Sequence, residues 1–284
     1  MRFLRFLGLL VASAALITGC TSNGGGPDDA GSRDDQVLGH VHGLGTDPAD
    51  GALYIATHFG VFRTARDGSL HRVADRWQDT MAFTVVGPGH FLASGHPDLR
   101  EDLPTHLGLI GSENAAESWS TLSLGGKADF HALDLTGDRI YGYDALTGRL
   151  LTTTDRTHWA LVSRVPVVDL AADPTDQDRV LVSAVNSALT VYDRGRGGSA
   201  VLENAPPVVL LDWPTDDLLV GVTAGGQVYR GSDSGRTWTR TTDVPGAPEA
   251  LDVTEQAWHI ATARGIYRSE DSGRTWQTVI AAEN

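Results

Sequence analysis

The hydrophobic residues of this chain fall in short runs whose pattern predicts strands. From residue 36 onward, β-branched and aromatic residues alternate with Gly-rich turns, and we find no convincing 3.6-residue periodicity. The C-terminal part shows the pattern most plainly, with predicted strands at residues 251–253, 257–261, 265–268 and 275–280. This pattern predicts an all-β fold.

A turn motif separates the last two of these strands, and it occurs twice. Residues 268–276 read RSEDSGRTW and residues 230–238 read RGSDSGRTW, 38 residues apart. Asp271 is placed to accept hydrogen bonds from backbone N–H groups across the turn, and Gly273 supplies a positive φ. We expect Trp276 and Trp238 to be largely buried anchors of the outgoing strands. Two near-identical copies indicate a repeat.

Weaker copies extend this repeat along the chain. Its anchor positions are separated by 47, 41, 38, 40 and 38 residues, and they are Asp67, Asn114, Asp155, Asp193, Asp233 and Asp271. The motif resembles the Asp-box (BNR) repeat, S-x-D-x-G-x-T-W, of sialidases, sortilin-type receptors and photosystem assembly factors. Six repeats share residues 36–284, about 41.5 residues each, which is the length of a four-stranded propeller blade. We therefore predict one six-bladed β-propeller over residues 36–284, with Asp-box turns joining the third and fourth strands.

The first 35 residues have the features of an export and anchoring segment. Arg2 and Arg5 precede an apolar run at residues 6–17 that is too short to span a bilayer. The run ends in Ile-Thr-Gly-Cys, which resembles a bacterial lipobox, and Cys20 is the only cysteine of the chain. We predict a lipoprotein signal peptide at residues 1–19, then a lipidated Cys20 and a flexible linker to residue 35. The protein is thus expected to be extracytoplasmic and anchored to the membrane through lipid on Cys20.

The net charge of −14 limits the partners of the domain's surface. So acidic a chain is a poor match for nucleic acid or anionic lipid. We expect a monomer whose partner, apart from the membrane at Cys20, is a small ligand, a metal ion or a protein at one face of the propeller.

The innermost strands of the six blades can be aligned, and the alignment separates the first three blades from the last three. The aligned apolar residues are Leu44, Phe83, Leu133, Leu170, Leu210 and Leu251. Two residues before them stand His42, Met81, His131, Val168, Val208 and Glu249, and four residues before them stand His40, Asp79, Asp129, Pro166, Pro206 and Ala247. The first three blades thus present His, Asp and Met where the later blades carry mostly Val, Pro or Ala.

Further polar residues are expected at the same mouth of the ring. The second strand of a blade returns to the face where the first begins, so His58 and His96 should border that mouth. The long loop 97–107 carries His106, and Asp144 ends the second strand of the third blade. The sequence therefore predicts a histidine-rich mouth, mainly in one half of the ring.

Short motifs around these residues resemble a family of bacterial secreted propellers labelled glycosylhydrolase-like. The motifs are HVHGL at 40–44, ATHFG at 56–60, MAF at 81–83, GHP at 95–97, LGL at 107–109 and DFH at 129–131, within a similarity over most of residues 38–160. The label implies a hydrolase, but no mechanism accompanies the motifs.

Three interpretations of this mouth remain open. The first is a metal site of His40, His42, His58, Met81 and His131, where imidazoles with a thioether favour copper and imidazoles with a carboxylate suit zinc. The second is glycoside hydrolysis by a carboxylate pair chosen from Asp79, Asp129, Asp144 and Glu249, without the F/Y-R-I-P motif of sialidases. The third is a non-catalytic propeller that binds a protein or small molecule, with His96 and His106 joining the four carboxylates as ligand contacts. An extracytoplasmic ligand-binding propeller covers the first and third, and a copper or zinc site is its most specific form.

Overall fold

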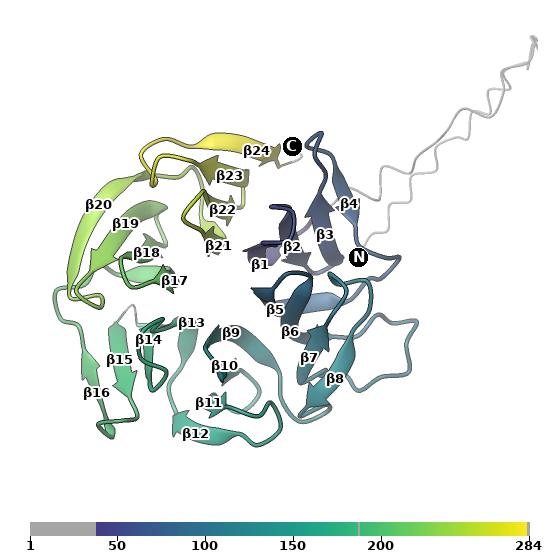
Figure 1. Ribbon diagram of the computed structural model, residues 1–284, viewed down its shortest axis with the longest axis horizontal. Coiled ribbons are helices and arrows are strands. Elements are labelled where there is room, and N and C mark those ends of the chain that lie inside the picture. Colours follow the sequence, from purple (N-terminus) through teal and green to yellow (C-terminus); the bar gives the residue numbers. More distant parts are fainter. Residues whose placement is uncertain (1–37, 187, 283–284) are drawn as a thin grey trace, which may run out of the picture. The chain divides into compact units, whose positions relative to one another are not determined.

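A computed structural model describes residues 38–186 and 188–282, and within them 24 strands form six four-stranded antiparallel sheets. All of these strands belong to one compact unit, residues 34–284. The sheets follow one another around a ring, as Figure 1 shows, so the predicted six-bladed β-propeller is confirmed. The signal peptide, the lipidated Cys20 and the linker predicted for residues 1–35 lie outside the described residues. In the described part of the chain, no helix is long and apolar enough to cross a bilayer.

Each sheet consists of four consecutive strands. The first contains β1 (Val41–Thr46), β2 (Leu53–Thr57), β3 (Gly60–Thr64) and β4 (Leu70–Arg72), and the second contains β5 (Asp79–Gly87), β6 (His90–His96), β7 (Leu109–Ser112) and β8 (Ser120–Ser123). The third contains β9 (Phe130–Thr136), β10 (Arg139–Asp144), β11 (Arg149–Thr153) and β12 (Ala160–Ser163), and the fourth contains β13 (Val167–Ala172), β14 (Arg179–Ala184), β15 (Leu189–Asp193) and β16 (Gly198–Val201). The fifth contains β17 (Val208–Thr215), β18 (Leu218–Thr223), β19 (Gln227–Ser232) and β20 (Thr237–Asp243), and the sixth contains β21 (Pro248–Val253), β22 (Trp258–Thr262), β23 (Gly265–Ser269) and β24 (Gln277–Ala281).

The hydrophobic core lies between neighbouring sheets. Tyr54 of the first sheet packs against Phe91 of the second, with ring centroids 4.7 Å apart. The ring is closed in the same way, because Val41 and Leu44 share a buried cluster with Ala250 and other residues of the sixth sheet. Full burial of a side chain of this size contributes about 1.5–3 kcal/mol. Packing between blades, rather than within one sheet, therefore holds the ring together.

The turn between β23 and β24 lies where the repeat predicted it, and its contacts explain its residues. Asp271 Oδ1 accepts hydrogen bonds from the backbone N–H groups of Arg274 (3.0 Å) and Thr275 (2.9 Å) and from the hydroxyl of Ser269 (2.8 Å). These contacts, above all with Thr275, lower the pKa of Asp271 to about 2. Gly273 has a φ of +75°, and a Cβ there would lie 2.5 Å from the ring of Trp258.

The tryptophans of these turns are largely buried, as predicted, although neither is fully enclosed. Trp276 and Trp238 lie on the edges of the clusters that they join. Trp258, in the second strand of its sheet, is 2 % exposed and takes the interior position. The fourth strand of a blade lies at the outer rim of the ring, so its tryptophan can cover the core but cannot enter it (Figure 1).

Every innermost strand carries a β-bulge near its start. A residue is skipped in the pairing of each with its neighbour, and the skipped residues are His42, Met81, His131, Val168, Val209 and Glu249. Five of these six residues are the ones that the sequence alignment placed two positions before the aligned apolar residue. In the fifth blade the bulged residue is Val209 instead of the expected Val208, which is buried. A bulge re-aims the skipped side chain, and all six line the central cavity.

Candidate metal centre at the mouth

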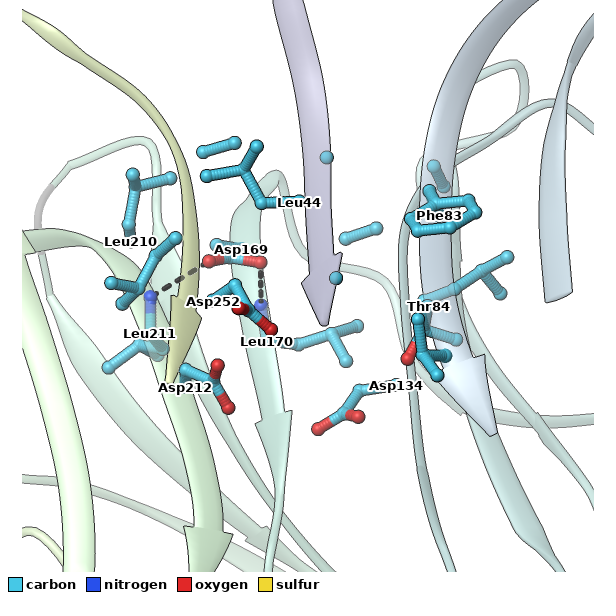
Figure 2. A pocket seen from close by; sticks show the side chains of 18 of the residues that line it. Leu44, Phe83, Thr84, Asp134, Asp169, Leu170, Leu210, Leu211, Asp212 and Asp252 are labelled. Atoms are coloured by element: carbon cyan, nitrogen blue, oxygen red, sulfur yellow. Dashed lines mark hydrogen bonds between the residues drawn. The ribbon is translucent and has the colours of Figure 1, made fainter. Parts of the chain in front are cut away.

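A cavity of about 860 Å³ lies at the centre of the ring and is bordered by all six innermost strands. The six bulged residues line its mouth. Further along the strands it is lined by apolar side chains and by four carboxylates, and Figure 2 shows Asp134, Asp169, Asp212 and Asp252 among them. The mouth and the channel therefore differ in chemistry although they share one cavity.

His42, His58 and Asp79 form a compact group at the mouth. His42 Nε2 lies 3.1 Å from His58 Nδ1, and His58 Nδ1 lies 2.9 Å from Asp79 Oδ1. The third side of the triangle, from His42 Nε2 to Asp79 Oδ1, is 3.7 Å long. Three potential ligand atoms from the first and second blades thus face one another.

The size of this triangle fits a transition-metal ion. A triangle with sides of 3.1, 2.9 and 3.7 Å has a circumradius of about 1.9 Å, just below the 2.0–2.1 Å of zinc–imidazole and zinc–carboxylate bonds. A point close to the plane of the three atoms is therefore at bonding distance from all of them. Further side-chain rotation is not needed to bring the donors together.

The surroundings of His42 keep its imidazole neutral. Burial is the main cause, and the neighbouring His58 and His40 add to it, so the pKa of His42 falls to about 4 although Asp79 acts in the opposite direction. The side chain is 9 % exposed. Only a neutral imidazole offers a lone pair to a metal, so His42 is available as a ligand at neutral pH.

Strand register places Asp79 and His96 side by side. They are directly paired residues of β5 and β6, and His96 Nδ1 lies 3.2 Å from Asp79 Oδ2. Gly95 makes this approach possible, because its φ is +147° and a Cβ there would lie 2.0 Å from the carbonyl oxygen of Asp79. One oxygen of Asp79 thus faces the imidazoles of the first blade, and the other faces His96.

A second group of donors surrounds Asp129. Its Oδ2 lies 3.1 Å from His131 Nε2, 3.6 Å from His96 Nε2 and 3.7 Å from His106 Nδ1. Burial raises the pKa of Asp129, but the contacts with His131, His96 and His106 outweigh it, so the pKa is lowered overall. His106 reaches this point because the loop after β6 returns to it, with Leu107 N donating to Gly95 O at 2.9 Å.

The five residues predicted as one metal site are distributed over different surroundings. His42 and His58 lie together with Asp79, whereas His131 contacts Asp129. His40 is 3.1 Å from Glu249 through Nδ1, although its ring is 4.8 Å from that of His42. Met81 lines the cavity.

The remaining predicted contacts, Asp144 and Glu249, have partners in the backbone. Asp144 is 1 % exposed, and its Oδ1 accepts a hydrogen bond from Asp129 N at 3.1 Å while its Oδ2 accepts one from the Thr147 hydroxyl. Glu249 Oε2 accepts a hydrogen bond from Val41 N at 3.1 Å, across the junction of the last and first blades. Both carboxylates thus hold the mouth in shape.

The carboxylates of the channel were not predicted from the sequence, and they link successive blades. Asp134 accepts a hydrogen bond from Ala172 N (2.8 Å), Asp169 from Leu211 N (2.8 Å) and Asp212 from Val253 N (2.6 Å). Asp252 closes the series by accepting one from Thr46 N at 3.1 Å. Acidic residues within apolar innermost strands were the available signal.

Burial raises the pKa values of three of these carboxylates. The pKa of Asp134 rises to about 6 and that of Asp169 to about 7, and that of Asp212 also rises well above its usual value. Their side chains border the cavity and are partly exposed to it, so solvent screening moderates this effect.

The propeller is similar to several solved structures. A GH74 xyloglucanase from Xanthomonas campestris matches with a TM-score of 0.57 and 19% identity, over 84% of this chain and 45% of that chain. A chain of a nidogen/laminin complex matches with a TM-score of 0.61 and 12% identity, over 80% of this chain and 91% of that chain. A structure of YCF48 bound to D1 peptide matches with a TM-score of 0.53 and 12% identity, over 86% of this chain and 82% of that chain.

These likenesses show the fold alone, because fold is shared by proteins of unrelated function. This chain spans less than half of the xyloglucanase. No protein-family model matches the chain, and no protein of curated function matches it.

Proposed function

We propose that this protein is an extracytoplasmic, lipid-anchored β-propeller that binds a zinc ion at its mouth through His42, His58 and Asp79. The observation that carries the proposal is the triangle of donor atoms with sides of 2.9–3.7 Å, into which an ion with bonds of about 2.0–2.1 Å fits. The net negative charge of the chain favours a bound cation, and the low pKa of His42 leaves its lone pair free of a proton at neutral pH.

The kind of donor supports zinc over copper. The atom that completes the triangle with the two imidazoles is a carboxylate oxygen of Asp79, and imidazoles with a carboxylate suit zinc. Two imidazoles and one carboxylate form a common set for zinc in sites that leave a fourth position for water or a ligand. At that fourth position, a bound zinc ion would coordinate an oxygen or nitrogen atom of a small ligand.

Glycoside hydrolysis has less support. A glycosidase needs two carboxyl groups free to face a sugar. Asp144 and Glu249 are held by backbone N–H groups, and Asp79 and Asp129 are each surrounded by imidazoles. The resemblance to secreted propellers labelled glycosylhydrolase-like is therefore a matter of architecture in this proposal.

Zinc titration tests the metal proposal. The full-length protein is purified without added metal and titrated with Zn²⁺ by calorimetry, beside His42→Ala and Val168→Ala. Val168 is the matched control, because it occupies the same bulged position in the fourth blade. We expect the parent and Val168→Ala to bind with equal affinity and His42→Ala to lose this binding event. Equal binding by all three proteins would refute the site.

Membrane anchoring needs a separate test, because it depends on Cys20 and not on the propeller. Cys20→Ala should leave the membrane fraction or accumulate with its signal peptide uncleaved. If this variant partitions into detergent as the parent does, the lipobox interpretation is wrong.

A further inference from the structure

We propose that the mouth contains a second metal centre, formed by His96, His106, His131 and Asp129 of the second and third blades. The proposal rests on the proposed function, since it extends metal binding from the first centre to its neighbours. The second centre differs in having four donors from the protein, three imidazole nitrogens and one carboxylate oxygen.

The distances around Asp129 bring three donors close together, with a fourth, His131, beside Asp129. In a tetrahedron with bonds of 2.0–2.1 Å the ligand atoms are about 3.3–3.4 Å apart. The separations of Asp129 Oδ2 from the nitrogens of His131, His96 and His106 are 3.1, 3.6 and 3.7 Å. Donor atoms of His96, His106 and Asp129 all lie within 4.8 Å of one another. Small shifts of these three donors would place a zinc ion among them. His131 contacts Asp129 but lies outside this 4.8 Å group, so its side chain has to move toward His96 and His106 to become the fourth ligand.

Two buried polar atoms of this group lack a hydrogen-bond partner within the described protein. They are Oδ1 of Asp129, a residue that is 8 % exposed, and Nδ1 of His106. Leaving such an atom unsatisfied costs about 1–3 kcal/mol, so a native structure normally supplies a partner. A metal ion bound to His106 Nδ1 would provide a partner for that nitrogen, and if the Asp129 carboxylate binds the ion through both oxygens, Oδ1 would gain a partner as well. This observation is independent of the spacing of the donors.

Asp79 orients a ligand of the second centre. His96 Nε2 faces Asp129, and its Nδ1 lies 3.2 Å from Asp79 Oδ2. A histidine that binds a metal through one nitrogen commonly donates the N–H of the other to a carboxylate, which fixes the ring and raises its basicity. Asp79 therefore serves the first centre as a ligand through Oδ1 and the second centre as a positioning residue through Oδ2.

The number of donors assigns different roles to the two centres. Three protein ligands leave a zinc ion with an open position, whereas four close it, as in sites that stabilise structure. The second ion would tie His106, on the long loop after β6, to the start of β9. We infer that this centre holds the loop against the mouth, and that the first centre is the one that meets a ligand.

Metal stoichiometry separates this proposal from the first. Full-length parent, His106→Ala, His42→Ala and the control Val168→Ala are loaded with Zn²⁺, dialysed without metal and analysed for zinc per chain. We expect two ions in the parent and in Val168→Ala, and one ion in each histidine variant. Asp129→Asn, which keeps the size of the side chain, should also retain one ion. Thermal unfolding of the metal-free proteins verifies that every variant is folded.

Each of the other possible zinc counts would overturn one centre or both. One ion in the parent that is lost in His42→Ala and kept in His106→Ala would leave the proposed function standing and remove the second centre. One ion lost in both variants would mean that all these residues serve a single centre. One ion lost only in His106→Ala would instead refute the first centre, and no ion in the parent would refute both.

Discussion

The mouth and the channel of this propeller are lined by similar side chains that have different partners. In the channel, each carboxylate accepts a hydrogen bond from a backbone N–H group of the next blade, as Asp212 does from Val253. At the mouth, Asp79 and Asp129 face imidazoles, with no backbone donor among the contacts that their side chains make in the described structure. Backbone partners are permanent, whereas imidazoles can exchange a carboxylate for a metal ion.

This difference in hydrogen-bond partners separates structural from functional polar residues within one cavity. The channel carboxylates complete the contacts between blades, so their removal should affect stability. The mouth residues satisfy one another only partly, as the unpartnered atoms of His106 and Asp129 indicate. Their removal should affect binding. The four predictions below test this division.

The largest effect is expected for Asp79→Asn. It replaces a ligand oxygen of the first centre and weakens the acceptor for His96, so zinc affinity should fall on the order of 100-fold at the first centre and about 10-fold at the second. Competition with a chromogenic chelator measures both. The control is Asp212→Asn in the channel, which should bind zinc as the parent does. If the control loses as much affinity as Asp79→Asn, the division between mouth and channel fails.

The next effect concerns stability, and it should appear in the channel alone. Asp212→Ala removes the acceptor of the 2.6 Å hydrogen bond from Val253 N, which leaves a buried donor unpaired. We expect the free energy of unfolding to fall by about 1–3 kcal/mol at acidic pH, where the raised pKa of Asp212 favours its uncharged form, with zinc binding unchanged. Urea unfolding provides the measurement. A variant as stable as the parent would show that the blades do not depend on this bond.

A smaller effect is the pH dependence that Asp169 contributes. Burial raises its pKa in the folded protein to about 7, against 3.8 when exposed, so between these values the folded state holds a proton that the unfolded state has lost. Its contribution to the free energy of unfolding is therefore present near pH 4 and is lost as the pH rises through about 7. A pKa difference of one between the folded and unfolded states corresponds to about 1.4 kcal/mol of stability. Solvent screening in the cavity reduces this contribution, so we expect Asp169 to account for about 1–2 kcal/mol of the free energy of unfolding.

The comparison of pH 5 with pH 8 isolates this contribution. Other groups also contribute to the pH dependence in this range. His42 is one of them, because its pKa is about 4 in the folded protein against 6.5 when exposed, so the parent's own pH profile is not diagnostic. The loss of stability from pH 5 to pH 8 should be smaller in Asp169→Asn than in the parent by the amount given above. An equal loss in both proteins would mean that Asp169 is ionised throughout.

The fold was predictable because a local signal repeats, but the grouping of the site was not. The turn around Asp271 recurs, and its spacing alone determines the number of blades. The histidines gather at one mouth because the order of strands in a blade brings them there. Their division into two groups depends on the cross-strand pair of Asp79 with His96 and on the return of the loop that carries His106. These are tertiary contacts that residue spacing does not encode.

The channel carboxylates escaped prediction for a related reason. Asp134 follows the aligned apolar residue by one position, Asp169 precedes it by one, and Asp212 follows it by two. Asp134 and Asp212 each follow the bulged residue of their strand by three positions, whereas Asp169 follows it by one, so no single alignment position identifies all three. An alignment that assumes regular strands separates residues that the structure brings into one series.

The smallest effect is expected for Glu249→Gln, which tests the boundary between the two regions. By position Glu249 is one of the six bulged residues of the mouth, but its Oε2 accepts a backbone hydrogen bond from Val41 N, as a channel carboxylate would. Glutamine keeps an acceptor for that donor and loses only the charge beside His40, which is half exposed, so the free energy of unfolding should change by less than about 0.5 kcal/mol. Zinc affinity should change by about twofold or less, measured beside Asp79→Asn under the same conditions. A loss of affinity near that of Asp79→Asn would make Glu249 and His40 part of the metal centre. The rule that backbone partners mark structural carboxylates would then fail at this bulged position of the mouth.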